Sequence, residues 1–369
     1  MATDNGEFMP IRNWDHVEFY VGNAKQAAHY YTTTFGFTVT AYAGLETGVR
    51  DRASYVLEQG KIRLVLTSPL TGDTAIGEHI FAHGDGVKDI ALEVPDAEKA
   101  YHEALARGAR SAYEPKTLED QYGQVKRAAI YTYGETIHSF IERQDYAGPF
   151  LPGYRAMGTV TATRQDGVGL AAIDHIVGNV ELGKMDAWVK FYEDVLGFEQ
   201  IIHFDDKAIT TEYSALMSKV MEGGAGKVKF PINEPAVGRK KSQIQEYLDY
   251  YGGPGAQHIA LITGDIVKTV REMRDRGVVF QAGLASYYEE LEGRVGKIDE
   301  NISDLAELGV LVDRDDDGYL LQIFTKNVQD RPTVFFEVIQ RKGARGFGEG
   351  NFKALFEAIE RDQALRGNL

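Results

Sequence analysis

The sequence predicts an α+β protein of two duplicated domains, each built from two βαβββ units that form a half-open barrel. Two observations lead to this fold class. The two halves of the chain repeat each other, and each half passes twice through the same order of strand-like and helix-like segments. A repeat of this length implies two related domains, because solenoids have much shorter units. With 369 residues, the chain is long enough for two domains that each have a core.

The repeat is visible when three pairs of segments are compared directly. The matched segments are 14–17 with 173–176, 84–92 with 253–261, and 139–143 with 337–341. The second match continues without a gap to the Arg-Gly pairs at 107–108 and 276–277. The first half is therefore a diverged copy of the second.

Hydrophobic periodicity gives the elements of the second half. The first unit is expected to have a strand at 173–180, a helix at 184–196 and strands at 198–204, 209–216 and 228–232. The second unit is expected to begin with a strand at Gln257, followed by a helix at 265–276 and strands at 308–313, 319–325 and 333–340. Helical spacing of Trp188, Phe191 and Val195 and a closing Gly197 support the first helix. One further helix is expected at 352–366.

The domain boundaries follow from a stretch rich in glycine, proline and polar residues between 143 and 171. We expect an N-terminal domain at 1–155 that lacks a metal site, a linker at 156–171, and a catalytic domain at 172–369. The catalytic domain includes the C-terminal helix.

Composition and charge exclude several classes of protein. The chain has no cysteine, so disulfides, thiolate metal ligands and a cysteine nucleophile are ruled out. A net charge of −15 makes nucleic acids and anionic membranes poor partners. No run of residues has the length of a membrane span, and no signal-like pattern opens the sequence. We therefore expect a cytoplasmic protein with a small-molecule substrate.

Three residues in the second half form a candidate metal site. His175, His258 and Glu337 lie in apolar, strand-like segments, and a buried carboxylate needs a compensating cation or donor set. The corresponding positions in the first half are His16, Asp89 and Ser139, so the fold itself does not require the set. Two imidazoles and one carboxylate are typical of a non-haem Fe(II) site with open positions, although zinc or manganese also suit them.

Each of the three residues also has a structural interpretation. A histidine beside a strand is, taken alone, more often a hydrogen-bonded core residue than a ligand. An arginine partner could neutralise a buried Glu337. The joint pattern favours a metal site, because the first half keeps neither His258 nor Glu337.

Two other motifs are expected to have no ligand. The segment 313–318 opens like a calcium loop, but its twelfth position is Phe324 and not glutamate, so we interpret it as an exposed acidic turn. The segment 346–350 lacks the Lys-Ser/Thr pair of a phosphate loop and is interpreted as a hinge before the C-terminal helix.

Several segments of the second half, in order, carry a family resemblance. They are 173–175, 230–235, 241–247, 257–258, 321–326, 330–333, 335–341 and 346–352. Together they resemble the catalytic domain of the 4-hydroxyphenylpyruvate dioxygenase family, which belongs to the vicinal-oxygen-chelate superfamily. The first half is similar to the degenerate N-terminal domain of that family, and its segment 22–31 resembles the bacterial branch.

The resemblance implies a function in tyrosine and phenylalanine catabolism. It implies that Fe(II) is bound by His175, His258 and Glu337, and that 4-hydroxyphenylpyruvate and O2 become homogentisate and CO2. Oxidative decarboxylation, ring hydroxylation and side-chain migration are the implied steps. A homo-oligomer, dimer or tetramer, is also implied. The implied substrate-binding residues are Ser218, Asn233, Gln243, Gln257, Gln322, Phe324, Phe335, Phe347, Asn351, Phe352 and Leu355.

Alternative functions remain open at this point. 4-Hydroxymandelate synthase uses the same substrate and metal but hydroxylates the benzylic carbon. Pro231, Asn233 and Phe352 favour the dioxygenase. A non-enzymatic binding protein is disfavoured by the complete ligand set. An extradiol ring-cleaving dioxygenase is disfavoured, because it would not need the hinge and the C-terminal helix. That helix is either a mobile lid or a permanent part of the domain.

Overall fold

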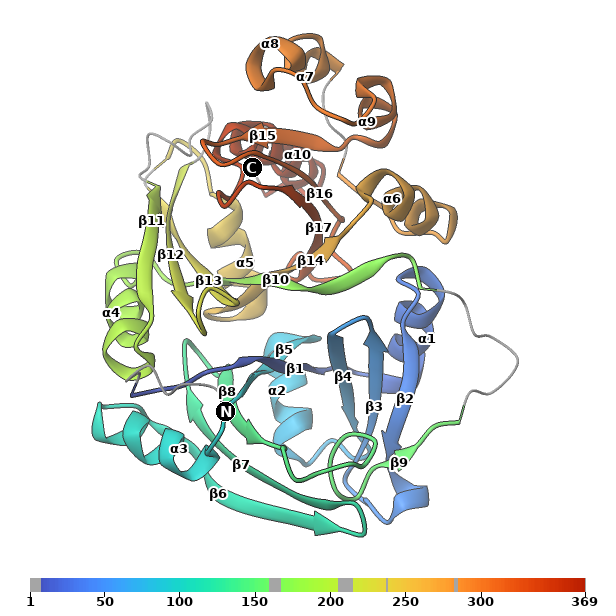
Figure 1. The fold of residues 1–369 in the computed structure, drawn as a ribbon, viewed down its shortest axis with the longest axis vertical. Coiled ribbons are helices and arrows are strands. Elements are labelled where there is room, and N and C mark those ends of the chain that lie inside the picture. The colour runs from blue at the N-terminus through green and yellow to red at the C-terminus, as the bar shows by residue number, and fades with distance from the viewer. Residues whose placement is uncertain (1–7, 159–166, 205–214, 237, 282–284, 369) are drawn as a thin grey trace.

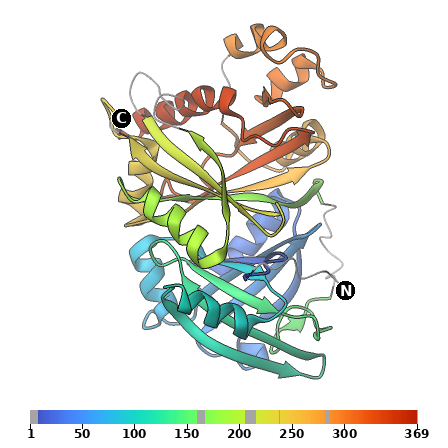
Figure 2. The ribbon, with the colours of Figure 1, turned by 60° about the vertical axis from the view of Figure 1, so that its left-hand side comes forward.

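A computed structural model describes residues 8–158, 167–204, 215–236, 238–281 and 285–368. The two halves of the chain form two curved sheets, stacked one above the other (Figure 1). Figure 2 shows the same stacking from a second direction. Among the described residues, no helix combines the length and the apolar character needed to span a bilayer.

The elements of the N-terminal half follow the order β-α-β-β-β twice, with additions. They are β1 (Asn13–Tyr20), α1 (Ala24–Thr34), β2 (Thr38–Ala43), the 3-10 turn η1 (Leu45–Thr47), β3 (Arg52–Gln59), β4 (Ile62–Pro69), α2 (Ala75–His83), β5 (Gly86–Glu93), α3 (Ala97–Ala106), β6 (Ser111–Asp120), β7 (Gly123–Tyr131), β8 (Ile137–Glu142) and β9 (Arg155–Ala156).

The C-terminal half repeats this order with more insertions. Its elements are β10 (Leu170–Asn179), α4 (Met185–Leu196), β11 (Glu199–Phe204), β12 (Ala215–Gly223), β13 (Val228–Ala236), α5 (Gln243–Tyr251), β14 (Gly255–Thr263), α6 (Ile266–Asp275), α7 (Ala285–Glu289), α8 (Leu291–Val295), α9 (Ile302–Leu308), β15 (Leu311–Arg314), β16 (Tyr319–Phe324), β17 (Phe335–Lys342) and α10 (Glu349–Leu365).

The strand order confirms the predicted βαβββ units. The second sheet has the order β11-β12-β13-β10-β14-β17-β16-β15, so two four-strand units meet where β10 pairs antiparallel with β14. The first sheet has the order β6-β7-β8-β5-β1-β4-β3-β2-β9, and β1 meets β5 in the same way. In each unit the first strand pairs in parallel with the last, which fits a half-open barrel.

Some predicted elements differ from the structure. The strand expected at 308–313 is partly wrong, because Leu308 ends α9 and β15 begins at Leu311. Gly309, with φ of 71°, closes that helix in a conformation that glycine tolerates best. Helices α2 and α5, which lie in corresponding places between the two units of each half, were not predicted, and α7, α8 and α9 are insertions in the C-terminal half. The strand expected at 209–216 lies almost entirely outside the described residues.

The N-terminal sheet continues into the stretch at 143–171 that is rich in glycine, proline and polar residues. Phe150 packs in a buried cluster with Val56 and Ile141, and β9 pairs with β2. The next described strand, β10, begins at Leu170. We propose that the N-terminal domain extends to about residue 157 and that the second begins at Leu170, close to the boundaries expected from the sequence.

The two halves share one core. Phe336 on β17 points away from its own barrel, and its ring lies 5.0 Å from that of Phe35 and 6.3 Å from that of Phe19. Its neighbours Phe335 and Glu337 point to the opposite face, because side chains alternate along a strand. Packing against the N-terminal half therefore fixes the strand that carries Glu337.

A buried ion pair connects β1 to the residue that follows β8. Asp15 on β1 is 7% exposed, and the Arg143 guanidinium, just after β8, donates to its two carboxylate oxygens at 2.5 and 2.7 Å. Burial alone would raise the pKa of Asp15, but Arg143 and His16 outweigh it and hold the pKa far below its usual range. The pair therefore stabilises the N-terminal sheet in its ionised form.

Replacing Asp15 by asparagine is expected to lower the free energy of unfolding at neutral pH by about 3 kcal/mol or more, because it leaves Arg143 unpaired. Since folding lowers the pKa of Asp15, its contribution is complete above the unfolded value of about 3.9 and is lost as the pH falls further. Urea denaturation of wild type and variant between pH 3 and 7 should show a gap that narrows toward low pH. The exposed pair of Asp51 with Arg52 provides the control, since Asp51→Asn should cost about 1 kcal/mol or less. Equal stability of wild type and Asp15→Asn at neutral pH would contradict the role of the pair.

Candidate active site and metal centre

Strand register brings His175, His258 and Glu337 to one face of the second sheet. His175 on β10 lies opposite Ala260 on β14, and Ala260 lies opposite Glu337 on β17. His258 precedes Ala260 by two residues, so its side chain points to the same face. Three segments that are far apart in sequence thus meet on adjacent strands.

The three side chains are close enough to share one cation. The Nε2 atoms of His175 and His258 each lie 3.3 Å from Oε2 of Glu337. One ligand atom from each residue falls within 4.8 Å of the others, and all three residues are buried. The group can therefore hold a metal ion.

Neighbouring residues orient both imidazoles toward Glu337. The Nδ1–H of His175 donates to Asp174 at 2.8 Å, and the Nδ1–H of His258 donates to the Gln257 amide oxygen at 3.0 Å. In these tautomers each Nε2 carries its lone pair on the side of the carboxylate. Outer hydrogen bonds of this kind are typical of histidines that bind metals. The donor set therefore fits a divalent transition metal.

The electrostatics of the metal-free site favour an ionised carboxylate. Burial alone would raise the pKa of Glu337, but His175 and the hydrogen bonds from both imidazoles lower it to about 2. Burial opposes protonation of His175, yet Glu337 and Asp174 outweigh it and raise its pKa. Burial is the largest influence on His258 and lowers its pKa. A metal ion held by the three side chains would balance the negative charge of Glu337.

A second layer of contacts fixes His175. Arg341 donates to both oxygens of Asp174 at 2.8 Å, and Phe347 places its ring edge-on to His175 with centroids 5.0 Å apart. The Arg341 guanidinium also lies 5.5 Å from the Phe347 ring centroid. These contacts hold the imidazole from the side away from Glu337.

The N-terminal half keeps this supporting layer without the ligands. Arg143 pairs with Asp15, and the His16 and Phe150 rings meet edge-on at 5.1 Å. At the positions of His258 and Glu337, however, Asp89 accepts hydrogen bonds from the backbone and the hydroxyl of Ser139. The first half thus retains the scaffold but satisfies its buried polar groups internally.

A cavity of about 560 Å³, which includes space open to solvent, lies beside the three residues. Ten of the eleven substrate-binding residues implied by the sequence line it. They are Ser218, Asn233, Gln243, Gln257, Gln322, Phe324, Phe335, Phe347, Phe352 and Leu355. They come from β12, β13, α5, β14, β16, β17 and α10, and Phe347 precedes α10. Figure 1 shows α5 and α10 on the concave side of the sheet.

Asn351, the eleventh residue, does not line the cavity. Its amide donates to the Gln322 oxygen at 3.1 Å and accepts from the Tyr287 hydroxyl at 2.6 Å. The Gln322 amide in turn lies 3.4 Å from Oε1 of Glu337. In this structure Asn351 therefore belongs to a buried chain of hydrogen bonds that ends on the carboxylate.

Sequence reasoning missed six lining residues, which are Val177, Phe204, Leu216, Val220, Pro231 and Phe356. The period of two along a strand could have found four of them. Val177 follows His175 by two residues on β10 and pairs with His258. Leu216 and Val220 flank Ser218 on the same face of β12, and Pro231 pairs with Val220 across β13. Phe204 and Phe356 carried no such signal, because they reach the cavity from β11 and α10.

The acidic turn at 313–318 has a role that the sequence did not reveal. The Asp315 carboxylate accepts from the backbone amides of Gly346, Arg345 and Gly318 at 2.8 to 2.9 Å. It is therefore half-buried and not simply exposed. It fixes the glycine-rich segment before α10, where Gly348 has φ of 79° and leaves no room for a Cβ beside the Gln322 amide.

Comparison with known proteins agrees with the geometry. Residues 172–323 match the Glyoxalase/Bleomycin resistance protein/Dioxygenase superfamily, and so do residues 15–123. 4-Hydroxyphenylpyruvate dioxygenase of Yarrowia lipolytica is 50% identical, over 97% of this chain and 94% of its own. The enzymes of that name from Dictyostelium discoideum and Xenopus tropicalis are 50% and 49% identical, over 97% and 100% of this chain and 100% and 96% of their own. The chain belongs to the 4-hydroxyphenylpyruvate dioxygenase family.

Family membership confirms the resemblance drawn from the catalytic segments. The bacterial branch is not confirmed, because these relatives are eukaryotic. A solved triple mutant of 4-hydroxymandelate synthase from Streptomyces coelicolor is also similar, with a TM-score of 0.86 and 33% identity over 96% of this chain and 100% of its own. An Mn(II)-bound glyoxalase from Novosphingobium aromaticivorans shares the fold, with a TM-score of 0.50 and 12% identity over 90% of this chain and 83% of its own.

Alanine at His175, His258 or Glu337 is expected to abolish tight Fe(II) binding at this site, because each removes a ligand from a set of three. The His16→Ala variant should bind metal like the wild type, since Asp89 and Ser139 offer no matching site. Titration of the metal-free proteins with Fe(II) under anaerobic conditions measures this directly, and circular dichroism checks folding. Wild-type affinity in a folded Glu337→Ala variant would rule out the assignment.

Proposed function

We propose that the protein converts 4-hydroxyphenylpyruvate and O2 to homogentisate and CO2, with Fe(II) as its metal. One observation carries the proposal. In a chain about 50% identical to enzymes named 4-hydroxyphenylpyruvate dioxygenase over nearly its full length, two histidines and a glutamate converge at the base of a cavity. The geometry supports a site where a small ligand and dioxygen both reach a metal.

His175, His258 and Glu337 would hold the iron. When bound, Fe(II) would activate dioxygen, with the 2-oxo acid of the substrate as the source of electrons. Because the protein would supply three ligands, the metal could also bind the substrate and dioxygen. The contacts of Asp174 and Gln257 keep the imidazoles in place while substrate and product exchange.

The lining side chains suit an aromatic 2-oxo acid. Phe335 stacks on His258 with ring centroids 4.8 Å apart, and Phe324 meets Phe335 edge-on at 6.2 Å. We assign these two phenylalanines to the apolar faces of the substrate ring. Gln243 and Asn233, which reach the cavity from α5 and β13, can hydrogen-bond the phenol or a carboxylate oxygen.

The walls of the cavity also exclude water. Phe352 meets Phe204 edge-on with centroids 5.0 Å apart, and Leu355 and Phe356 extend this apolar wall along α10. Exclusion of water favours transfer of oxygen to the substrate over loss of the oxidising equivalents. The opening of α10 as a lid during turnover stays a hypothesis. The cytoplasmic location and the assembly into a dimer or tetramer also stay hypotheses.

4-Hydroxymandelate synthase is the alternative function, because the solved synthase shares the fold at 33% identity. Pro231, Asn233 and Phe352 favour the dioxygenase, and all but Asn351 of the implied contact residues line the cavity. The relatives that are about 50% identical carry the dioxygenase name. Ring hydroxylation is therefore the reaction that we propose.

Anaerobic loading with Fe(II), addition of 4-hydroxyphenylpyruvate and O2, and mass spectrometry of the product test the proposal. Homogentisate and CO2 in equal amounts are expected. 4-Hydroxymandelate as the main product would establish the alternative. An iron-loaded protein that turns over neither compound would contradict both.

Replacing Phe352 by leucine is expected to divert part of the product to 4-hydroxymandelate or to uncoupled oxygen use, because it loosens the wall that positions the ring. The ratio of homogentisate formed to O2 consumed measures the change. Phe81, which is 87% exposed on α2, gives the matched control, since Phe81→Leu should leave the ratio unchanged. An unaltered product ratio and rate in Phe352→Leu would limit Phe352 to packing.

A further inference from the structure

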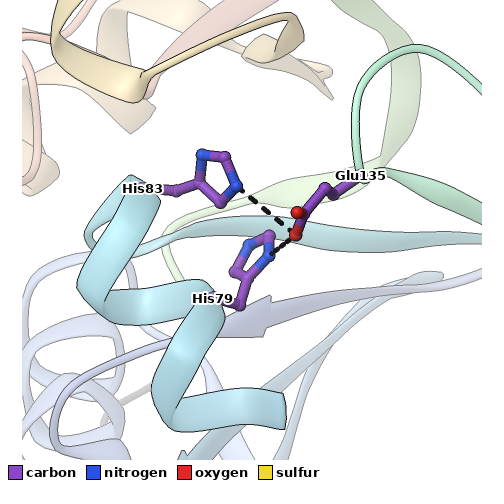
Figure 3. A group of neighbouring side chains, drawn as sticks. All are labelled: His79, His83 and Glu135. Atoms are coloured by element: carbon purple, nitrogen blue, oxygen red, sulfur yellow. Dashed lines mark hydrogen bonds and ion pairs between the residues drawn. The ribbon is translucent and has the colours of Figure 1, made fainter.

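A second group of metal-binding side chains lies in the N-terminal half, away from the cavity. His79 and His83 stand one turn apart on α2, and Glu135 approaches them from the turn between β7 and β8 (Figure 3). Nδ1 of His79 lies 2.9 Å and Nε2 of His83 3.4 Å from the same carboxylate oxygen of Glu135. Residues four apart on a helix share one face, so both imidazoles can reach one ion.

The histidines are buried, and their nitrogens are incompletely satisfied. His79 is 4% and His83 7% exposed, and Nε2 of His83, the nitrogen that faces Glu135, lacks a hydrogen-bond partner among the described residues. Buried polar atoms normally have partners, so an unpartnered nitrogen needs an explanation. Tyr20 and Tyr251 pack against the two rings and keep water from their outer faces.

The tautomer of His83 is fixed by its surroundings. Its Nδ1–H donates to the backbone carbonyl of Tyr251 at 2.7 Å, so a neutral ring carries its lone pair on Nε2. That lone pair then faces a carboxylate oxygen of Glu135, which is also an acceptor. Two acceptors at this distance repel each other unless a proton or a metal ion lies between them.

A metal ion satisfies the group better than a proton. The imidazole rings lie 4.5 Å apart, so placing a proton on both is unfavourable. Neutral imidazoles and an ionised carboxylate are the protonation states in which these side chains bind metals.

We propose that His79, His83 and Glu135 bind a divalent transition metal ion, zinc in the first place. Two nitrogens and one carboxylate oxygen are ligands that zinc prefers, whereas magnesium and calcium favour oxygen alone. Glu135 is half exposed, with 55% of its side chain accessible, so water can complete the coordination. The set has the same ligand types as the candidate active site but lies in the other half of the chain.

The supporting contacts resemble those of a metal site. The carbonyl of Tyr251 orients His83 in the way that outer-layer carbonyls orient metal-bound histidines. Lys88 donates to the backbone carbonyl of Glu135 at 2.6 Å and holds the turn that carries the carboxylate. The site is therefore anchored on α2, on β5 and on the C-terminal half.

The position of the site indicates a structural effect. Tyr251 ends α5, whose first residue, Gln243, lines the cavity. Arg331, also from the C-terminal half, donates to the carbonyls of Ala82 and Tyr250 at 2.8 and 3.1 Å and so joins the same two helices. A metal on His83 would strengthen this junction between the halves, and its binding should raise thermal stability.

Zinc stoichiometry in four full-length proteins tests the proposal. Wild type, His83→Gln, Glu337→Gln and the double variant are freed of metal, equilibrated with ZnCl2 and analysed by elemental mass spectrometry. We expect two bound zinc ions in the wild type, one in each single variant and none in the double variant. His29→Gln, a change at an exposed histidine on α1, should bind two. Equal zinc binding by His83→Gln and wild type, in number and affinity, would overturn the proposal.

Two further measurements keep the test decisive if His83→Gln folds poorly. In Glu337→Gln, zinc should raise the melting temperature, and Glu135→Gln in the same background should remove the rise and weaken zinc binding by at least about tenfold.

In zinc-soaked wild-type crystals, an anomalous difference map should show a peak between His79, His83 and Glu135. A peak at the His175 site with none at the His79 site would refute the second site. Homogentisate formation is measured separately, so a failure of the proposed reaction does not affect these readouts.

Discussion

The candidate active site depends on the burial of one carboxylate. Glu337 is 2% exposed in the middle of β17, where an isolated negative charge would cost several kcal/mol. The register of β10, β14 and β17 places two imidazole nitrogens 3.3 Å from its oxygen, and this arrangement both compensates the charge and creates a candidate metal site. The same register aims Phe336 into the core shared with the N-terminal half, so the position of the carboxylate is tied to the packing of the whole molecule.

Hydrogen bonds from surrounding side chains fix the orientation of the two imidazoles and the carboxylate. Arg341 holds Asp174, which orients His175. Gln257 orients His258, and a chain from Tyr287 through Asn351 and Gln322 reaches Glu337. The N-terminal half shows which part of this system is scaffold. There Arg143, Asp15 and His16 repeat the outer contacts, while Ser139 and Asp89 satisfy each other and leave no ligand set. Duplication has thus preserved the support in both halves, whereas the two histidines and the glutamate occupy these repeat-related positions in the C-terminal half alone.

The sequence predicted the parts of the structure that depend on local pattern and on the repeat. The βαβββ units follow from strand and helix periodicity, and the divergence between Glu337 and Ser139 indicated the half that carries the candidate site. Helices α7 to α9 were not predictable in this way, because they have no counterparts in the N-terminal half, and α5 was missed together with its counterpart α2. Phe204 and Phe356 were missed because the tertiary packing of β11 and α10 decides that they reach the cavity. Asp315 was read as an exposed turn, since only the folded chain brings backbone amides to its carboxylate.

The central claim is that the register of β10, β14 and β17 builds one iron site on His175, His258 and Glu337. An anomalous difference map at the iron edge, from crystals loaded anaerobically with Fe(II), tests it most directly. The account predicts a strong peak in contact with Nε2 of both histidines and with an oxygen of Glu337, on the side that faces the cavity. A map from fully loaded crystals in which the iron peak lies elsewhere, with these three side chains bonded only to one another, would contradict it.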